Sequence, residues 1–138
     1  MGRWVRRVSA VAAGLFVAVL IIMAVQALSG LLYPAPPGLD LTDREAFAAY
    51  ARQLPIGALL IVELSYLLGS LAAGATVAWV ARDSHTRLAM AAGVVLTLAG
   101  FTNLAAIPHP VWFAVLTTVT YIPCAWLGVR VVRGRHAG

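Results

Sequence analysis

Apolar residues form four long runs in this chain, and short polar segments separate them. The runs cover about residues 8–32, 56–81, 88–107 and 111–132. As helices they are long enough to cross the hydrocarbon layer of a bilayer, which takes about 20 apolar residues. Prolines stand in the polar segments after the first and third runs, where they end helices. The pattern predicts an all-α membrane protein: a bundle of four transmembrane helices that forms one domain, residues 1–138.

The first connecting segment, residues 33–55, is the only long one outside the predicted spans. Thr42 followed by Glu45 has the spacing of a capping box, which predicts a short helix that starts here and runs to about Leu54. Apolar residues recur on one face of that helix, so we expect it to be amphipathic and to lie along the membrane interface against the bundle. The residues of this face are Phe47, Tyr50, Ala51 and Leu54.

Composition supports the membrane assignment and excludes other classes. Hydrophobic residue types make up 62% of the 138 residues and charged types only 11%, which is too little charge for a soluble domain or a disordered chain. A single cysteine, Cys124, excludes a disulfide framework and a multi-cysteine metal site.

The distribution of positive charge predicts the orientation. Of the ten basic residues, all arginines, two lie in the segment 33–55 and the others flank the opposite ends of the predicted spans. Basic residues are retained on the cytoplasmic side, so both termini are expected there. The high positive charge is thereby explained as a topology signal, and we expect no nucleic-acid partner. The eight arginines on the predicted inner side are Arg3, Arg6, Arg7, Arg82, Arg87, Arg130, Arg133 and Arg135.

Glu63 is the only ionisable residue with a position deep inside a predicted span. It follows Pro55 by eight positions, which places it roughly 12 Å into the second helix. A carboxylate at this depth is costly unless it is protonated, hydrated or paired, so it should face the bundle interior or a partner subunit. We therefore take Glu63 as the centre of a candidate proton- or ligand-binding site.

Helical spacing indicates which residues share the environment of Glu63. One stripe of the second helix is polar toward its outer end and small at its centre, as an inward face would be; it consists of Glu63, Tyr66, Ser70, Gly74 and Val77. The functional interpretation is a polar cavity, open toward the outer side, bounded by Glu63, Tyr66, Asn103, Thr117 and Tyr121, with His109 at its mouth. The alternative is a protonated Glu63 that only holds helices together by a hydrogen bond to Tyr66, Asn103 or a threonine. Gln26, near the outer end of the first helix, could complete the rim of this cavity, but packing is the favoured interpretation.

Motifs of known catalytic and cofactor-binding sites are absent from the sequence. There is no nucleophile elbow, zinc-protease motif, phosphate-binding loop or dinucleotide fingerprint. We therefore expect no cofactor and no metal. An enzyme is the less favoured class, although a tuned carboxylic acid beside tyrosines could still perform acid–base chemistry on a lipid or another apolar substrate.

Two strings resemble segments of a family of small four-helix bacterial inner-membrane proteins. They are Tyr33-Pro34-Ala35-Pro36-Pro37-Gly38-Leu39-Asp40 and Ile107-Pro108-His109-Pro110-Val111-Trp112-Phe113. The resemblance implies a location in a bacterial inner membrane and the four-span architecture, but no activity. In size and in its single intramembrane glutamate, the chain is also similar to small multidrug-resistance exporters, whose sequence pattern it lacks.

Three functions follow from these features. The first is transport of a small polar or cationic solute coupled to protonation of Glu63, in a possible homodimer. The second is an accessory or structural role in a larger membrane complex, with the small-residue helix faces as contact surfaces. The third and least favoured is a lipid-modifying or isomerising enzyme.

Overall fold

The computed structural model describes residues 2–81 and 85–136, and all regular structure within them is helical. Four helices are long and apolar enough to cross a membrane, as judged by length and composition. The fifth, α2, is short and lies in the first connecting segment. The helices are α1 (Arg3–Leu32), α2 (Arg44–Ala51), α3 (Ile56–Ala81), α4 (His85–Ala106) and α5 (Val111–His136).

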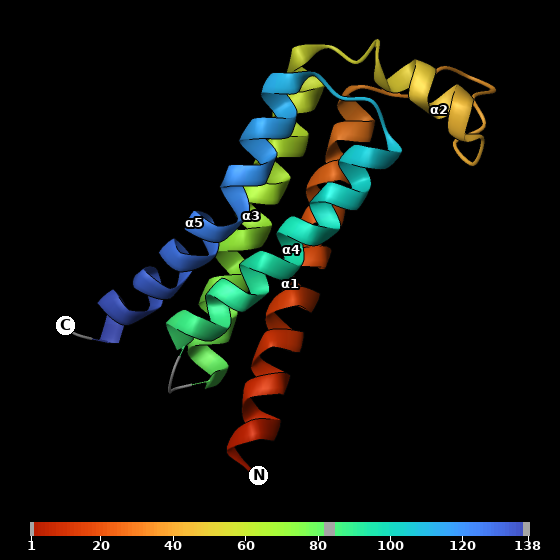
Figure 1. Cartoon of the computed structure of the whole chain (residues 1–138). Helices are drawn as coiled ribbons and strands as arrows, with labels where there is room; N and C mark the ends of the chain where they lie inside the picture. Colours follow the sequence, from red (N-terminus) through yellow and green to blue (C-terminus); the bar gives the residue numbers. More distant parts are fainter. Residues whose placement is uncertain (1, 82–84, 137–138) are drawn as a thin grey trace.

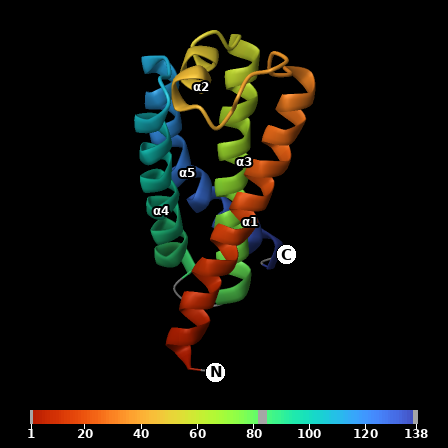
Figure 2. The same cartoon turned by 90° about the vertical axis from the view of Figure 1, so that its right-hand side faces the viewer.

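Helix α3 is the centre of the bundle. It packs against α1, α4 and α5, whereas α1 and α4 share only a limited contact. Figures 1 and 2 show α3 between α1 and α5, with α2 at one end and the start of α1 and the finish of α5 toward the opposite end. We call these the α2 end and the terminal end. The C-terminal part of α5 splays away from the other helices (Figure 1).

The bounds of the long helices agree closely with the predicted spans. α3 coincides with the predicted range, while α1 begins five residues earlier and α4 three residues earlier than predicted. After α1, Pro37 and Gly38 occupy the centre of a tight turn in which the Leu39 amide donates to the Pro36 carbonyl at 3.2 Å. Gly38 has a φ of 82°, which residues with a side chain rarely adopt. Arg82, part of the predicted inner charge, lies outside the described residues.

The segment around α2 differs from the prediction in two respects. The capping box is wrong: the N-cap is Asp43, whose side chain accepts hydrogen bonds from the Glu45 and Ala46 amides. The Thr42 hydroxyl instead donates to Asp40 Oδ1 at 2.6 Å. The helix also ends at Ala51 rather than near Leu54.

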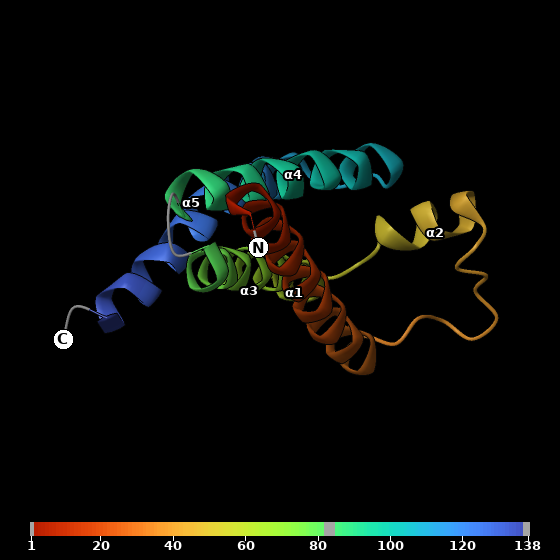
Figure 3. The same ribbon diagram turned by 90° about the horizontal axis from the view of Figure 1, so that it is seen from below.

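The position of α2 also differs from the expectation that it lies on the bundle. It packs closely against none of the four long helices, and Figure 3 shows it extending to one side of them. Phe47 and Tyr50 are half-buried, and the Tyr50 hydroxyl donates to the Tyr33 carbonyl at 3.5 Å. A position along a membrane interface therefore stays a prediction.

Small residues let the long helices approach one another closely. A Cβ added at Gly74 would meet the Ala125 backbone of α5, and one added at Gly128 would meet the Leu71 carbonyl of α3. At Gly14 of α1, an added Cβ would lie 2.9 Å from the Ala73 carbonyl. Such close contact provides the packing that holds helices together in lipid.

Large apolar side chains cover the outside of the bundle, and the interior is rich in alanine, glycine and serine. Leu31 and Val111 are 80% exposed and Phe16 is 65% exposed, whereas Ala10, Ala73 and Ala92 are fully buried. An apolar exterior of this extent would be unfavourable in water. It is compatible with a protein whose solvent is lipid.

Candidate functional site

Glu63 lies inside the bundle, where it joins α3 to α5. Its side chain is 6% exposed, so it faces neither lipid nor the membrane surface. Oε2 lies 2.6 Å from the Thr117 hydroxyl, and Oε1 lies 2.6 Å from the Thr120 hydroxyl. Within the described part of the chain these two hydroxyls are its hydrogen-bond partners.

Thr120 has two oxygen atoms within hydrogen-bond distance of its hydroxyl. Thr120 Oγ1 lies 2.6 Å from Glu63 and also 2.8 Å from the Leu116 carbonyl oxygen. A threonine hydroxyl has one proton, and a carbonyl oxygen can only accept. Thr120 can donate to an ionised Glu63, or donate to Leu116 and accept a hydrogen bond from a protonated Glu63, while Thr117 donates to the other carboxyl oxygen. A proton on Glu63 allows both bonds of Thr120 to form at once.

Two tyrosines and an asparagine continue the polar environment away from Glu63. Tyr66, one helical turn after Glu63 on α3, has its ring 5.6 Å from the ring of Tyr121 on α5. The Asn103 side-chain amide of α4 donates to the Tyr66 hydroxyl at 3.1 Å. Side chains from three helices therefore meet in one polar cluster beside the glutamate.

A cavity of about 250 Å³ adjoins this cluster. Tyr66, Tyr121 and Asn103 line it, together with Gln26 of α1. Exposed Val19 of α1 and exposed Ala99 of α4 also line it, so the cavity reaches the side of the bundle between these two helices. Glu63 and Thr117 are not among its lining residues.

The structure therefore places the site residues that the sequence predicted in separate groups. Glu63 and Thr117 form a closed hydrogen-bonded centre, and Tyr66, Tyr121 and Asn103 line the adjoining cavity. The cavity faces sideways, whereas the sequence suggested an opening at the outer end. The inward face predicted for α3 is buried along its length: Glu63, Tyr66, Ser70, Gly74 and Val77 are all buried.

His109 lies apart from this centre, in the turn before α5. Its Nδ1 donates to the Ile107 carbonyl at 2.7 Å, and its ring stacks on Phe113 with centroids 5.0 Å apart. Phe113 itself is buried in the same core cluster as Tyr66 and Tyr121. His109 is thus held in the turn and makes no hydrogen bond to Glu63 among the described residues.

Sequence reasoning gave too little weight to Thr120 and Gln26. Thr120 follows Thr117 by three positions, which places both on one face of a helix, but its bond to Glu63 depends on how α3 and α5 are placed along each other. The Gln26 side-chain amide lies 3.4 Å from the Ser65 hydroxyl and lines the cavity, so it belongs to the polar site as well as to packing. No set of three or more potential metal ligands comes together in residues 2–81 and 85–136.

Comparison with known proteins adds no assignment. No protein-family model, curated protein or solved structure matches the chain. The resemblance to small bacterial inner-membrane proteins consequently stays a prediction, and the functional argument depends on the site alone.

Proposed function

We propose that the protein is a four-span carrier of a small cationic solute in a bacterial inner membrane, with both termini in the cytoplasm. In this proposal a proton on Glu63 and the solute are bound alternately. The observation that carries it is the buried Glu63 carboxyl, bonded to hydroxyls alone within the described residues, beside a polar cavity that reaches the side of the bundle.

The lining of the cavity favours a cation. Tyrosine faces attract cations, most strongly where water is excluded, and Tyr66 and Tyr121 both line the cavity. The amide oxygens of Gln26 and Asn103 can accept hydrogen bonds from an ammonium group. Deprotonated Glu63 would add a negative charge next to this site.

The volume of the cavity limits the size of the solute. Cavities that bind drug-sized molecules measure about 300–1,000 Å³, whereas this one measures about 250 Å³. A small alkylammonium ion suits this space better than a large aromatic cation does.

The proposed coupling between protonation of Glu63 and binding of the solute follows from the position of Thr120 next to Tyr121 on α5. Loss of the Glu63 proton makes the carboxylate an acceptor only, so Thr120 must give up its bond to the Leu116 carbonyl in order to donate to Glu63. Pro123 lies three residues further along the same helix and lacks an amide proton, which weakens the helix at this point. Gain or loss of the proton on Glu63 therefore affects α5, which is also the helix that places Tyr121 in the cavity wall.

The test is proton release on cation binding, measured with a pH indicator on purified protein in weakly buffered detergent solution. Tetramethylammonium, which carries a permanent charge, is expected to release protons from the wild type and none from Glu63→Gln. Glu45→Gln, which removes an exposed acid of α2, is the matched control and should behave as the wild type.

Proteoliposomes complete the test. An imposed pH gradient should drive tetramethylammonium uptake by the wild type and the Glu45→Gln control, and not by Glu63→Gln. Equal proton release from Glu63→Gln and the wild type would contradict the proposal. Absence of gradient-driven uptake in the wild type would contradict it as well.

An accessory role in a larger complex is the second candidate, and the position of α2 favours it. α2 extends from the bundle without close packing against any long helix (Figure 3). The small-residue faces, by contrast, are occupied inside the chain at Gly14, Gly74 and Gly128. Native mass spectrometry of the protein purified from its host would show a stoichiometric partner in this case, and Glu63→Gln would leave the complex intact.

A further inference from the structure

One side chain in the wall of the polar cavity has a polar group without a partner. Tyr121 lines the cavity and is only 3% exposed. Its ring lies against Gly100 of α4, where an added Cβ would be 2.9 Å from the Tyr121 hydroxyl oxygen. Within residues 2–81 and 85–136 this hydroxyl makes no hydrogen bond. A buried hydroxyl that stays unpaired is costly, so its place in a cavity wall points to a ligand that supplies the bond.

A second acceptor lies in the same wall. The Asn103 side chain uses its amide nitrogen to donate to the Tyr66 hydroxyl at 3.1 Å, and its carbonyl oxygen makes no hydrogen bond among the described residues. The rings of Tyr66 and Tyr121 are 5.6 Å apart. Oxygen acceptors beside aromatic rings are suitable surroundings for an ammonium group that has N–H donors.

The outer part of the cavity is apolar. Its walls there are Val19 and Ile22 of α1 and Leu96 and Ala99 of α4. Val19 is 49% exposed and Ala99 is exposed as well, so the cavity opens between these two helices, which share only a limited contact. A ligand that fills the whole space is therefore polar at its inner end and apolar at its outer end.

The depth of this opening determines what it faces. Val19 lies thirteen residues before Leu32, where α1 ends, and Ala99 lies seven residues before Ala106, where α4 ends. At about 1.5 Å per residue, they are roughly 20 Å and 10 Å from the α2 end of their helices. The hydrocarbon core of a bilayer is about 30 Å thick. In a bundle that spans it, the opening faces acyl chains and not headgroups.

We propose that the polar cavity binds an amphiphilic primary alkylammonium ion that enters from the bilayer between α1 and α4. The nitrogen lies near Tyr121 and Asn103, and the alkyl chain leaves through the opening beside Val19 and Ala99. This inference rests on the proposed function and adds to it the class of the solute and its route. The cavity of about 250 Å³ holds the ammonium group and the first carbons, and the open side accommodates the rest of the chain.

A lipid acyl chain suits the site less well. It would fill the apolar opening, but it has no donor for the Asn103 carbonyl oxygen and no partner for the Tyr121 hydroxyl. Both polar groups would then stay unpaired in a dry site, at a cost that an ammonium group avoids.

Equilibrium dialysis of labelled alkylammonium ions against the protein in lipid nanodiscs tests the role of the chain. The amount taken up by empty nanodiscs of the same lipid is subtracted, which removes partition into the bilayer. The affinity of the wild type should rise about fourfold for each methylene from methylammonium to butylammonium. Butanol, which has the same chain without the charge, should bind about tenfold more weakly than butylammonium.

A substitution at the opening tests the route. Ala99→Phe places a ring in the path of the chain and should reduce the gain in affinity per methylene, with little effect on methylammonium. Ala91→Phe adds the same ring to an exposed position of α4 outside the cavity and should keep the wild-type gain.

The Tyr121 hydroxyl is tested by Tyr121→Phe, which keeps the ring. This variant should bind butylammonium about tenfold more weakly. Its affinity for tetramethylammonium, which has no N–H donor, should fall much less. Tyr50→Phe removes a hydroxyl from α2 instead and should match the wild type with both ions. Thermal unfolding of each variant checks that the fold is retained.

Three results would overturn the inference: equal wild-type affinities for methylammonium and butylammonium, equal affinities for butanol and butylammonium, or an unchanged butylammonium affinity in Tyr121→Phe. The second of these would identify the occupant as an apolar chain. None of the measurements involves proton release or a gradient. A flat chain-length series with normal cation-linked proton release contradicts this inference alone, whereas a rising series in a protein that releases no protons contradicts the proposed coupling and leaves the binding site.

Discussion

Glu63 and its two threonines show how a carboxyl group can be held inside a helical bundle with no positive partner among the described residues. Thr117 and Thr120 are three residues apart on α5, so both point to the same side of that helix and reach the two carboxyl oxygens. These two hydroxyls can satisfy the acid in its neutral form, in which most of the cost of burying a charge is avoided. This arrangement can store a proton, and it can also hold α3 against α5.

The neutral state of Glu63 is testable directly. Infrared spectra of the protein at neutral pH should contain the carbonyl stretch of a protonated carboxyl group, and Glu63→Gln should remove it. Thr120→Val, which takes away one hydrogen-bond partner, should shift the band to higher frequency, whereas Thr120→Ser should leave it near its original position. A wild-type spectrum without this band would show that Glu63 is ionised.

Asp40 gives a second prediction at the same scale, outside the membrane-spanning helices. The hydroxyl of Thr42, followed by its backbone amide, lowers the pKa of the Asp40 carboxyl below its ordinary value. The stabilisation of this turn is therefore present above the ordinary pKa and is lost as the pH falls through the lowered one.

Thr42→Val should raise the pKa of Asp40 toward its ordinary value, since the hydroxyl bond is lost while the amide bond remains. Thr42→Ser should retain the lowered pKa. A titration of the Asp40 carboxyl carbon by nuclear magnetic resonance measures both variants, and an unchanged pKa in Thr42→Val would show that the hydroxyl has no influence.

At the scale of elements, contact between backbones sets the geometry of the bundle. The approach of α3 to α5 depends on Gly74 and Gly128, which face the Ala125 backbone and the Leu71 carbonyl. The same two helices carry Glu63 and its threonines. The relative position of α3 and α5 that these glycines allow is therefore also the position in which both threonines reach the carboxyl group.

Gly74→Ala should consequently destabilise the protein by about 1–3 kcal/mol, as overpacking does in other close-packed interiors. Gly30→Ala is the matched control, because an added Cβ at this position of α1 meets nothing within 4 Å. That control should be neutral or slightly stabilising, since alanine favours a helix over glycine. Thermal unfolding in detergent compares the two variants, and equal melting temperatures would contradict this account of the packing.

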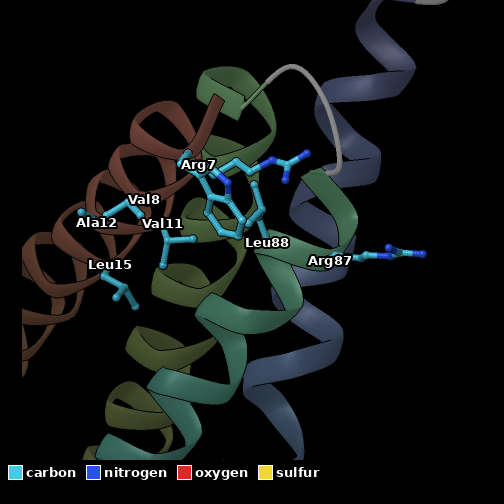
Figure 4. Close-up of a pocket in the computed structure, with 8 residues that line it drawn as sticks. Arg7, Val8, Val11, Ala12, Leu15, Arg87 and Leu88 are labelled. Carbon is cyan, nitrogen blue, oxygen red and sulfur yellow. The ribbon is translucent and has the colours of Figure 1, made fainter. Parts of the chain in front are cut away.

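At the scale of the molecule, the bundle is tight around α3 and looser between α1 and α4. The polar cavity near Glu63 and a second cavity, lined by Leu15 of α1 and Leu88 of α4 (Figure 4), both lie along this line of limited contact. A small solute can therefore reach the polar cavity from the side of the bundle.

Orientation is the prediction that belongs to the whole molecule. In intact bacterial cells, a membrane-impermeant thiol reagent should label Leu41→Cys, which is exposed at the α2 end, and should leave Gly134→Cys unlabelled until the cells are opened. The native Cys124 is buried and should give little background. Labelling of Gly134→Cys in intact cells would reverse the proposed orientation.

The extent of the long helices was predictable because it depends on local properties. Apolar length and the prolines after α1 and α4 act within a few residues, and the inward face of α3 follows from helical periodicity. The N-cap was not predictable in this way, since Thr42 and Asp43 are both suitable. Asp40 decides between them by engaging the Thr42 hydroxyl, which leaves Asp43 to cap α2.

The arrangement of the site depended on contacts between helices, which periodicity does not determine. Whether Glu63 meets Asn103 or a threonine depends on the relative height and rotation of α3, α4 and α5. These are fixed by where glycines permit close approach. The same holds for the sideways cavity, which exists because α1 leans on α3 rather than on α4.

The partners of Glu63 follow it in the chain by 54 and 57 residues, which has a consequence for biosynthesis. When α3 leaves the ribosome, α5 has not yet emerged from it, so the acid enters the insertion machinery before its eventual neighbours can reach it. Until α5 is inserted, α3 should be unstable in the hydrocarbon core of the bilayer. Chains that stop before α5 would then expose the acid to lipid, a mark by which cellular proteases could distinguish unfinished copies from complete ones.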